Sequence, residues 1–309
     1  MVKKVQTILG PISEEELGFT LVHEHLITNP PLWKIKEDPD FLLNDIYKSA
    51  TELESFKLAG GKTIVDGTSI DWGRNIKALL EIANRVKGIN IIATSGFNRG
   101  DYCEEWVREW SVKDLAQLLI KELTKGIDET NAKAGILKIG TSYNNILPLE
   151  RKIIQAVSEA HRITHAPITA HTTLGTMALE QLKILKEENV ELHKVAFIHM
   201  DQNLDLWYYR KILESGAYIE FDGPSKVKYH SDELRIKYLN KLIKEGFEDQ
   251  ILISGDMGRR SYLKAYGGGP GLTFIITQFI PRLKESGWDD KLISKIFVKN
   301  PAKYLAFLD

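Results

Sequence analysis

Cysteine and long apolar runs are both scarce in this sequence. The single cysteine, Cys103, excludes an internal disulfide and favours a reducing compartment such as the cytoplasm. No stretch approaches the roughly 18 to 20 apolar residues that a membrane span needs. The N-terminus, M-V-K-K-V-Q, lacks the apolar core of a signal peptide. We therefore expect a cytoplasmic protein without a membrane partner.

An excess of charge is missing as well. The 41 basic and 42 acidic residues leave a net charge of −1, which argues against a nucleic-acid surface. No low-complexity segment and no linker rich in proline, glycine or serine divides the chain. A length of 309 residues suits one barrel domain as well as two smaller domains. We predict a single domain over residues 1–309, and we expect a homodimer.

Short β-rich runs alternate with amphipathic helical stretches along the whole chain. The predicted strands cover residues 19–25, 62–68, 90–97, 135–141, 167–172, 195–200, 217–222 and 251–256. The helical stretches cover residues 46–58, 75–86, 112–125, 149–164, 177–188, 206–214, 231–244 and 274–296, the last with a break near Gly287. Eight such units predict an α/β fold of the (β/α)8 TIM-barrel type. The alternative, an open doubly wound sheet, would carry a glycine-rich phosphate turn after an early strand, and L-I-T-N-P-P is no such turn.

Polar side chains stand at the C-terminal ends of these predicted strands. In the first strand, F-T-L-V-H-E-H, His23 and His25 are two residues apart and therefore point to the same face. His171, His199 and Asp256 end three later strands. Each of them alone has an ordinary explanation, as a hydrogen-bonded core histidine or a turn aspartate. Their recurrence at strand ends, where such barrels carry their active sites, predicts a metal site.

Lys138 lies inside the fourth predicted strand, in G-I-L-K-I-G. Burial of an ammonium group in an apolar strand is unfavourable and lowers the pKa of the amine. A neutral amine can react with carbon dioxide to form a carbamate, which is an anionic oxygen ligand able to bridge two metal ions. The alternative is a lysine that extends to solvent from the barrel rim, and its apolar neighbours Leu137 and Ile139 make that less favourable.

This pattern resembles the phosphotriesterase family of the amidohydrolase superfamily. The similarity lies in H-x-H on the first strand, lysine on the fourth, histidine on the fifth and sixth, and aspartate on the eighth. It extends to the segments G-F-T-L-V-H-E-H-L, L-K-I-G-T, H-T-T and N-P-A-K-Y-L. The resemblance covers nearly the whole chain and implies a metal-dependent hydrolase with a binuclear centre at the C-terminal strand ends.

The resemblance also implies a role for each ligand. His23, His25 and Asp256 would hold the more buried metal ion, and His171 and His199 the more exposed one. The carboxylated lysine and a hydroxide would bridge the two ions. Zinc is the expected ion, while manganese and cobalt suit the same ligands. The hydroxide would attack the substrate, and Asp256 would pass its proton to the leaving group.

The loops after the seventh and eighth strands carry clustered cations. Loop seven, residues 222–230, contains Lys226 and Lys228, and loop eight, residues 256–271, contains Arg259, Arg260 and Tyr262. Barrels of this type often bind phosphate with these two loops, and these side chains suit a phosphate monoester. The alternative is a solvated basic loop.

A phosphorylated lactone fits these features best. We predict hydrolysis of a phosphorylated sugar lactone, a five-membered 1,4-lactone 5-phosphate, because the R-R-S-Y and K-x-K segments also look like the branch of the family that acts on such lactones. The alternatives are an acyl-homoserine lactonase, or an organophosphate or carboxyl esterase with the same centre. A barrel that binds a sugar phosphate without turnover is a further alternative.

Overall fold

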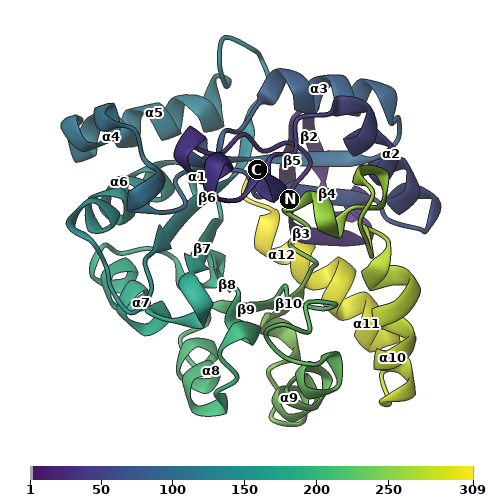
Figure 1. Cartoon of the computed structure of the whole chain (residues 1–309). Helices are drawn as coiled ribbons and strands as arrows, with labels where there is room; N and C mark the ends of the chain where they lie inside the picture. Colours follow the sequence, from purple (N-terminus) through teal and green to yellow (C-terminus); the bar gives the residue numbers. More distant parts are fainter. Residues whose placement is uncertain (1–2, 309) are drawn as a thin grey trace.

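The computed structural model describes residues 3–308 and contains eight parallel strands arranged as a barrel (Figure 1). The strands follow one another around the sheet in chain order, each paired with the next. They are β3 (Thr20–Glu24), β4 (Thr63–Asp66), β5 (Asn90–Gly96), β6 (Ala134–Thr141), β7 (Ile168–Thr172), β8 (Val195–Ile198), β9 (Tyr218–Phe221) and β10 (Ile251–Ile253). The predicted TIM-barrel fold is confirmed.

The barrel closes between its first and last strands. The backbone N–H of Asp256, just after β10, donates to the carbonyl of His23 on β3 at 3.0 Å. The Glu24 carboxyl group accepts from the N–H groups of Gly255 and Met257 at 2.7 and 2.9 Å. The closure therefore joins the two chain segments that carry His23, His25 and Asp256.

Helices surround the barrel, as Figure 1 shows along its axis. They are α1 (Leu32–Glu37), α2 (Ile46–Leu58), α3 (Ile76–Arg85), α4 (Glu105–Glu109), α5 (Val112–Thr124), α6 (Pro148–Thr164), α7 (Ala178–Glu187), α8 (Leu206–Leu213), α9 (Asp232–Lys244), α10 (Ile280–Glu285), α11 (Asp290–Ser294) and α12 (Asn300–Leu305). Several begin where a side chain accepts a hydrogen bond from the first turn, which satisfies an otherwise unpaired backbone N–H. Asp45, Asn75, Ser111 and Ser231 do so for α2, α3, α5 and α9.

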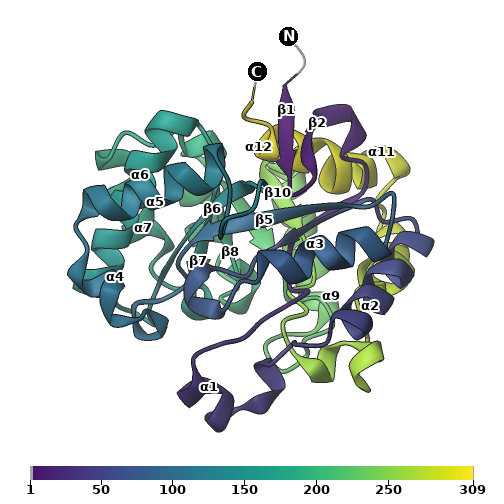
Figure 2. The same cartoon turned by 90° about the horizontal axis from the view of Figure 1, so that it is seen from above.

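Alternation along the strands divides the core in two. Leu21, Ile64 and Ile91 pack outward against the helices, whereas their chain neighbours Val22 and Val65 belong to a separate cluster. This second cluster includes Val5 from a short antiparallel hairpin, β1 (Lys4–Thr7) with β2 (Gly10–Ser13), and Tyr304 and Leu305 from α12. Figure 2 shows the hairpin, α12 and both chain ends together at one end of the barrel, with α1 at the other. The hairpin was not predicted, because it lies outside the alternation of strands and helices on which the strand predictions depend.

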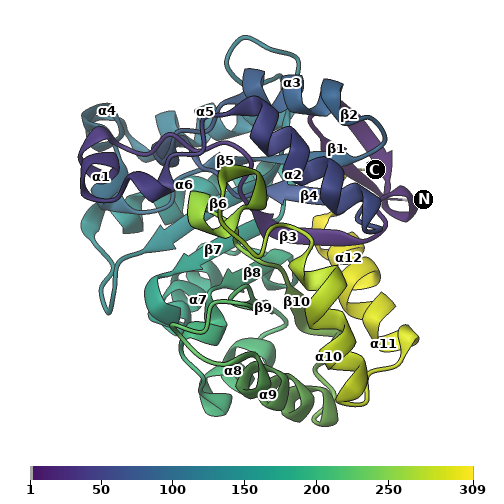
Figure 3. The same ribbon diagram turned by 45° about the vertical axis from the view of Figure 1, so that its right-hand side comes forward.

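The C-terminal helical region is interrupted as expected. α10 ends at Glu285, Gly287 has φ +105°, and α11 begins at Asp290. The chain includes π-helical turns at Ile275–Phe279 and Lys295–Lys299. Figure 3 brings this region forward, beside β3 and β10. Among the described residues, no helix combines the length and the apolar content of a membrane span.

A buried arginine fixes loop seven to the barrel. Arg235 of α9 is fully buried and donates to Asp201, which follows β8, and to Asp232. It also donates to the backbone carbonyls of Lys226 and His230 in loop seven. One side chain thus connects α9, the end of β8 and the loop that carries two of the predicted substrate-binding lysines.

We expect Arg235→Met to lower the free energy of unfolding by about 3–5 kcal/mol, because it leaves the buried carboxylate of Asp201 without its cation. Urea unfolding followed by circular dichroism measures this. Arg282→Met is the matched control, since Arg282 also pairs with Asp232 but its side chain is 49% exposed. That control should change stability by less than about 1 kcal/mol. Equal effects of the two substitutions would contradict the role given to Arg235.

Candidate metal centre

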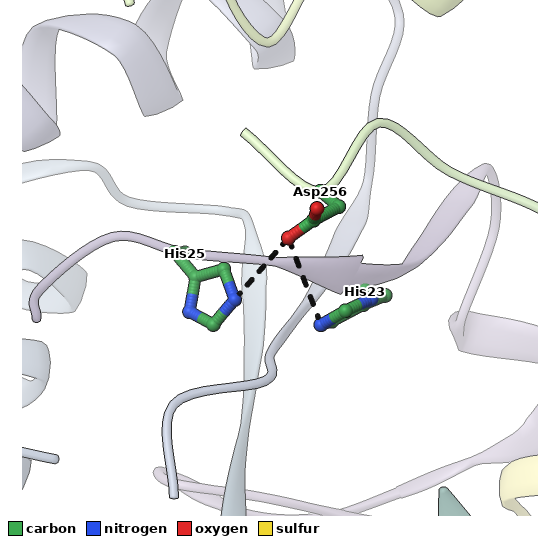
Figure 4. Close-up of side chains that lie close together, drawn as sticks. All are labelled: His23, His25 and Asp256. Carbon is green, nitrogen blue, oxygen red and sulfur yellow. Dashed lines mark ion pairs between the residues drawn. The ribbon is translucent and has the colours of Figure 1, made fainter. Parts of the chain in front are cut away.

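The first strand and the last loop bring three of the predicted ligands together. Nε2 of His23 lies 3.9 Å from Oδ1 of Asp256, and Nε2 of His25 lies 3.5 Å from the same oxygen. Figure 4 shows both imidazoles directed at this carboxylate. These separations exceed the usual length of a hydrogen bond. They approximate the spacing of two ligands that each lie about 2.0–2.2 Å from a shared ion. Among residues 3–308, the three side chains form one of two groups of histidines and carboxylates whose ligand atoms lie within 4.8 Å of one another.

The protonation of these histidines suits a metal ion. Burial lowers the pKa of His23 to about 3, so its ring is neutral. Its Nδ1 contacts Asp222 at 2.9 Å, which places the proton on Nδ1 and leaves a lone pair on Nε2. Nε2 of His23 is buried and has no hydrogen-bond partner among the described residues. A buried nitrogen without a partner is unfavourable unless an ion binds it. The residues therefore fit a metal ion.

His171 and His199 lie beside this group. Nδ1 of His171 and Nε2 of His199 are 2.9 Å apart, and the His199 ring centroid is 5.2 Å from that of His23. His199 has φ +63° and Asp256 has φ +44°, a left-handed conformation that is unfavourable for residues other than glycine. Strained backbone of this kind tends to occur at functional sites, where surrounding contacts maintain it. Two of the predicted ligands are therefore held in conformations that an ordinary strand would not give them.

Asp222, at the end of β9, orients two of these histidines. Its carboxylate accepts from Nδ1 of His23 at 2.9 Å and from Nδ1 of His199 at 3.0 Å. Burial alone would raise the pKa of Asp222, but the imidazoles of His199 and His23 hold it below its usual range. This residue was not among the predicted site residues. Its only signal was an aspartate that ends the seventh strand, at a position equivalent to that of Asp256 on the eighth.

Lys138 lies on β6 with 2% of its surface exposed. Its Nζ donates to the carbonyl of Gly67 at 2.7 Å. Burial lowers the pKa of Lys138, although the carboxylates of Asp256 and Asp71 oppose that effect. A lower pKa increases the fraction of neutral amine, which is the form that reacts with carbon dioxide.

One cavity of about 210 Å³ opens above these groups. All six predicted metal ligands line it, namely His23, His25, Lys138, His171, His199 and Asp256. The side chains of Lys226, Lys228, Arg259 and Tyr262 also line the cavity, whereas that of Arg260 does not. The cavity is smaller than the range of about 300–1,000 Å³ typical for drug-sized ligands. The arrangement favours a small polar substrate above the predicted metal ligands.

The cations of loops seven and eight have different partners. Nζ of Lys226 is 2.6 Å from Oδ2 of Asp256, so this lysine contacts a predicted metal ligand. Nζ of Lys228 lies 5.6 Å from the ring centre of Tyr262 and forms no ion pair among residues 3–308. Arg260 donates to the Leu42 carbonyl at 2.6 Å and to Asn44, away from the cavity.

Loop one, residues 26–45, holds Arg259 in place. Nη1 of Arg259 donates to Asp38 at 2.6 Å, and its guanidinium lies 3.7 Å from the ring centre of Phe41. Asp40 accepts from the backbone N–H and the hydroxyl of Ser261 at 2.8 and 2.6 Å. Loop one had no predicted role, because these pairs join residues about 220 positions apart in the chain.

Comparison with known proteins agrees with this geometry. A model of the phosphotriesterase family matches residues 3–305. A phospho-furanose lactonase from Mycoplasmopsis synoviae is 35% identical over 99% of this chain and 92% of its own length. The crystal structure of a lactonase from Listeria monocytogenes superposes with a TM-score of 0.95 at 41% identity, covering 99% of this chain and 100% of that one. A phosphotriesterase homology protein from Escherichia coli, solved with phosphate in its active site, has a TM-score of 0.90 at 36% identity, covering 94% and 99%.

We expect Asp222→Asn to reduce metal affinity by about 10- to 100-fold, because an amide cannot accept from both Nδ1–H groups with full charge. Metal content per chain after dialysis against a weak chelator, followed by elemental analysis, measures this. Asp205→Asn is the matched control, since Asp205 caps α8 away from the cavity and asparagine caps equally well. Unchanged metal retention in Asp222→Asn would contradict the orienting role.

Proposed function

Because the chain belongs to the phosphotriesterase family and is a hydrolase acting on ester bonds, we propose that its substrate is a phosphorylated five-membered sugar lactone, a 1,4-lactone 5-phosphate. The observation that carries this proposal is the cationic edge of the cavity formed by Lys228, Arg259 and Tyr262. The name of the Mycoplasmopsis relative and the phosphate in the Escherichia coli structure support it.

The contacts of Arg259 suit a phosphate group. Only Nη1 forms hydrogen bonds within residues 3–308, to Asp38 and Asp40. Nε and Nη2 remain for two parallel bonds to a phosphate, which is the geometry that a guanidinium prefers. Lys228 contributes a second positive charge and Tyr262 a hydroxyl donor. We leave Arg260 out of the proposed contacts because its guanidinium faces loop one.

The proposed metal sites use the ligands of the cavity floor. His23, His25 and Asp256 would hold one ion, His171 and His199 a second, and carboxylated Lys138 both, with zinc the first candidate. When bound, such ions supply Lewis acidity and lower the pKa of water. Asp256 takes up the proton released as water attacks the ester and delivers it to the leaving alkoxide. Lys226 holds Oδ2 of Asp256, which leaves Oδ1 directed at the histidines.

An acyl-homoserine lactonase or a neutral ester hydrolase is the second candidate. Apolar side chains of Phe41, Trp72 and Leu174 also line the cavity, and these would suit an acyl chain. The small cavity volume and the charged edge favour the phosphorylated substrate over a long acyl chain.

We expect Arg259→Met to lower kcat/KM for a pentono-1,4-lactone 5-phosphate by roughly 10- to 100-fold, since a charged hydrogen-bonding group is lost. The unphosphorylated lactone should be affected by less than about twofold, because it makes no contact with the guanidinium. Steady-state assays of both lactones, with thermal melting of each variant, provide the measurement.

Lys264→Met is the control for that experiment. It removes a cation from the same loop at a position outside the cavity lining, so the preference for the phosphorylated lactone should persist. An equal loss on both lactones in Arg259→Met would assign Arg259 to loop structure instead of phosphate binding. A wild-type preference for long-chain lactones over phosphorylated ones would favour the second candidate.

We also expect a carbamate on Lys138. After incubation with ¹³C-labelled bicarbonate and a divalent metal, the wild-type protein should show a carbamate carbon resonance that is absent in Lys138→Met. The physical reason is that burial lowers the pKa of this amine and adjacent cations stabilise the anionic carbamate. Lys194→Met should retain the resonance, because Lys194 is another buried lysine with a lowered pKa but lies outside the cavity lining. Persistence of the signal in Lys138→Met would locate the carbamate elsewhere.

A further inference from the structure

Loop three, residues 97–104, follows β5 and forms a wall of the cavity that is distinct from the cationic edge. Asn98 and Arg99 line this wall. β5 and β9 are four strands apart in the eight-stranded barrel, so loop three and loop seven lie on opposite sides of its axis. A substrate whose phosphate contacts loops seven and eight therefore presents its other end to loop three.

The backbone of this wall is held firmly. The N–H of Asn98 lies 2.8 and 2.9 Å from the two Asp71 oxygens, and the N–H of Arg99 donates to Asp71 at 3.0 Å. Gly96, with φ +122°, brings the chain so close to β6 that a Cβ would lie 2.2 Å from the Lys138 carbonyl. These contacts fix Asn98 relative to the strand that carries Lys138.

Two buried polar atoms of this wall have no partner within residues 3–308. Oδ1 of Asn98 is buried and accepts no hydrogen bond, and its amide nitrogen donates none. Nε of Arg99 is also buried and unpaired, whereas Nη1 and Nη2 donate to the Tyr102 hydroxyl and to Asp101. Leaving such buried groups unpaired is unfavourable. Unpaired buried polar atoms are rare in native structures and call for an explanation, and both of these belong to residues that line the cavity.

We propose that Asn98, assisted by Arg99, recognises a ring hydroxyl of the substrate and thereby determines which lactones react. A hydroxyl both donates and accepts, so one such group can pair with an amide oxygen and a guanidinium N–H together. The positive charge of Arg99 is already compensated by Asp101 at 2.7 Å, which favours a neutral group over a second anion. The inference rests on the proposed function and extends it to the sugar ring.

The hydroxyl in question is the one on C2. In a 1,4-lactone 5-phosphate, the phosphate arm is attached at C4, and the reacting carbonyl is C1. With C1 above the predicted metal ligands and the arm on loops seven and eight, C2 is the hydroxyl-bearing ring carbon farthest from the phosphate. Its substituent therefore projects toward loop three. The hydroxyl on C3 is adjacent to the phosphate-bearing side of the ring.

The test compares a pentono-1,4-lactone 5-phosphate with its 2-deoxy and 3-deoxy analogues. The wild-type enzyme should prefer the 2-hydroxylated substrate over the 2-deoxy analogue by roughly 10-fold in kcat/KM. Asn98→Leu, which keeps the side-chain shape, should lose this preference by losing activity on the 2-hydroxylated substrate. The parent lactone and its 3-deoxy analogue both carry the C2 hydroxyl, so the ratio of their kcat/KM values should stay unchanged in Asn98→Leu. A fall in this ratio would show that Asn98 recognises the C3 hydroxyl and would overturn the assignment to C2.

Asn145→Leu is the matched control, because Asn145 is exposed and outside the cavity lining. It should retain the wild-type preference. Asn98→Ser serves as a second variant if the leucine variant does not fold. An unchanged 2-hydroxy to 2-deoxy ratio in both Asn98 variants would overturn the inference while leaving the proposed function standing. Failure of the wild-type enzyme to hydrolyse any phosphorylated lactone would overturn both.

Discussion

The cavity floor depends on one buried carboxylate. Asp222 accepts hydrogen bonds from Nδ1 of His23 on β3 and from Nδ1 of His199 after β8, and also from the backbone N–H of His199. These three bonds compensate for burial of the charge. They also place the protons of both rings on Nδ1 and leave the lone pairs on Nε2, where that of His23 has no partner among residues 3–308 and that of His199 faces Nδ1 of His171. Without this acceptor the imidazoles would have neither a fixed tautomer nor a fixed orientation.

The buried acidic groups beneath the cavity differ in their protonation. Glu220 and Asp222 are two residues apart on the same strand and therefore share a face. Burial and the charge of Asp222 raise the pKa of Glu220, whose carboxyl group pairs with the hydroxyl of Ser254. Burial likewise raises the pKa of Glu24 to about 8. Like charges in close proximity move pKa values apart. The negative charge thus remains on Asp222, which accepts hydrogen bonds from two imidazoles.

Local sequence patterns were sufficient for the barrel and for the convergence of the predicted ligands at its strand ends. Strand alternation and the spacing of His23 and His25 are local, and parallel strands deliver their ends to one side of the barrel. The contacts of Asp222 and Arg259 could not be predicted, because they join segments 23 to 221 residues apart. In the sequence, Asp222 and Arg259 are a single aspartate and a single arginine, and their partners become apparent only in the closed fold. The β1–β2 hairpin was missed because it packs beneath the barrel instead of repeating its strand pattern.

The upper part of the cavity depends on contacts between loops one and eight. Arg259 is shared between Asp38 of loop one and the cavity, so its position depends on a loop that supplies no proposed contact to the phosphate. The stacking of its guanidinium on Phe41 removes rotational freedom that a free arginine would lose on binding. Strand ends therefore carry the predicted metal ligands, while pairs between loops position the proposed substrate contacts. Substitutions in loop one can change substrate preference without altering any group of the floor.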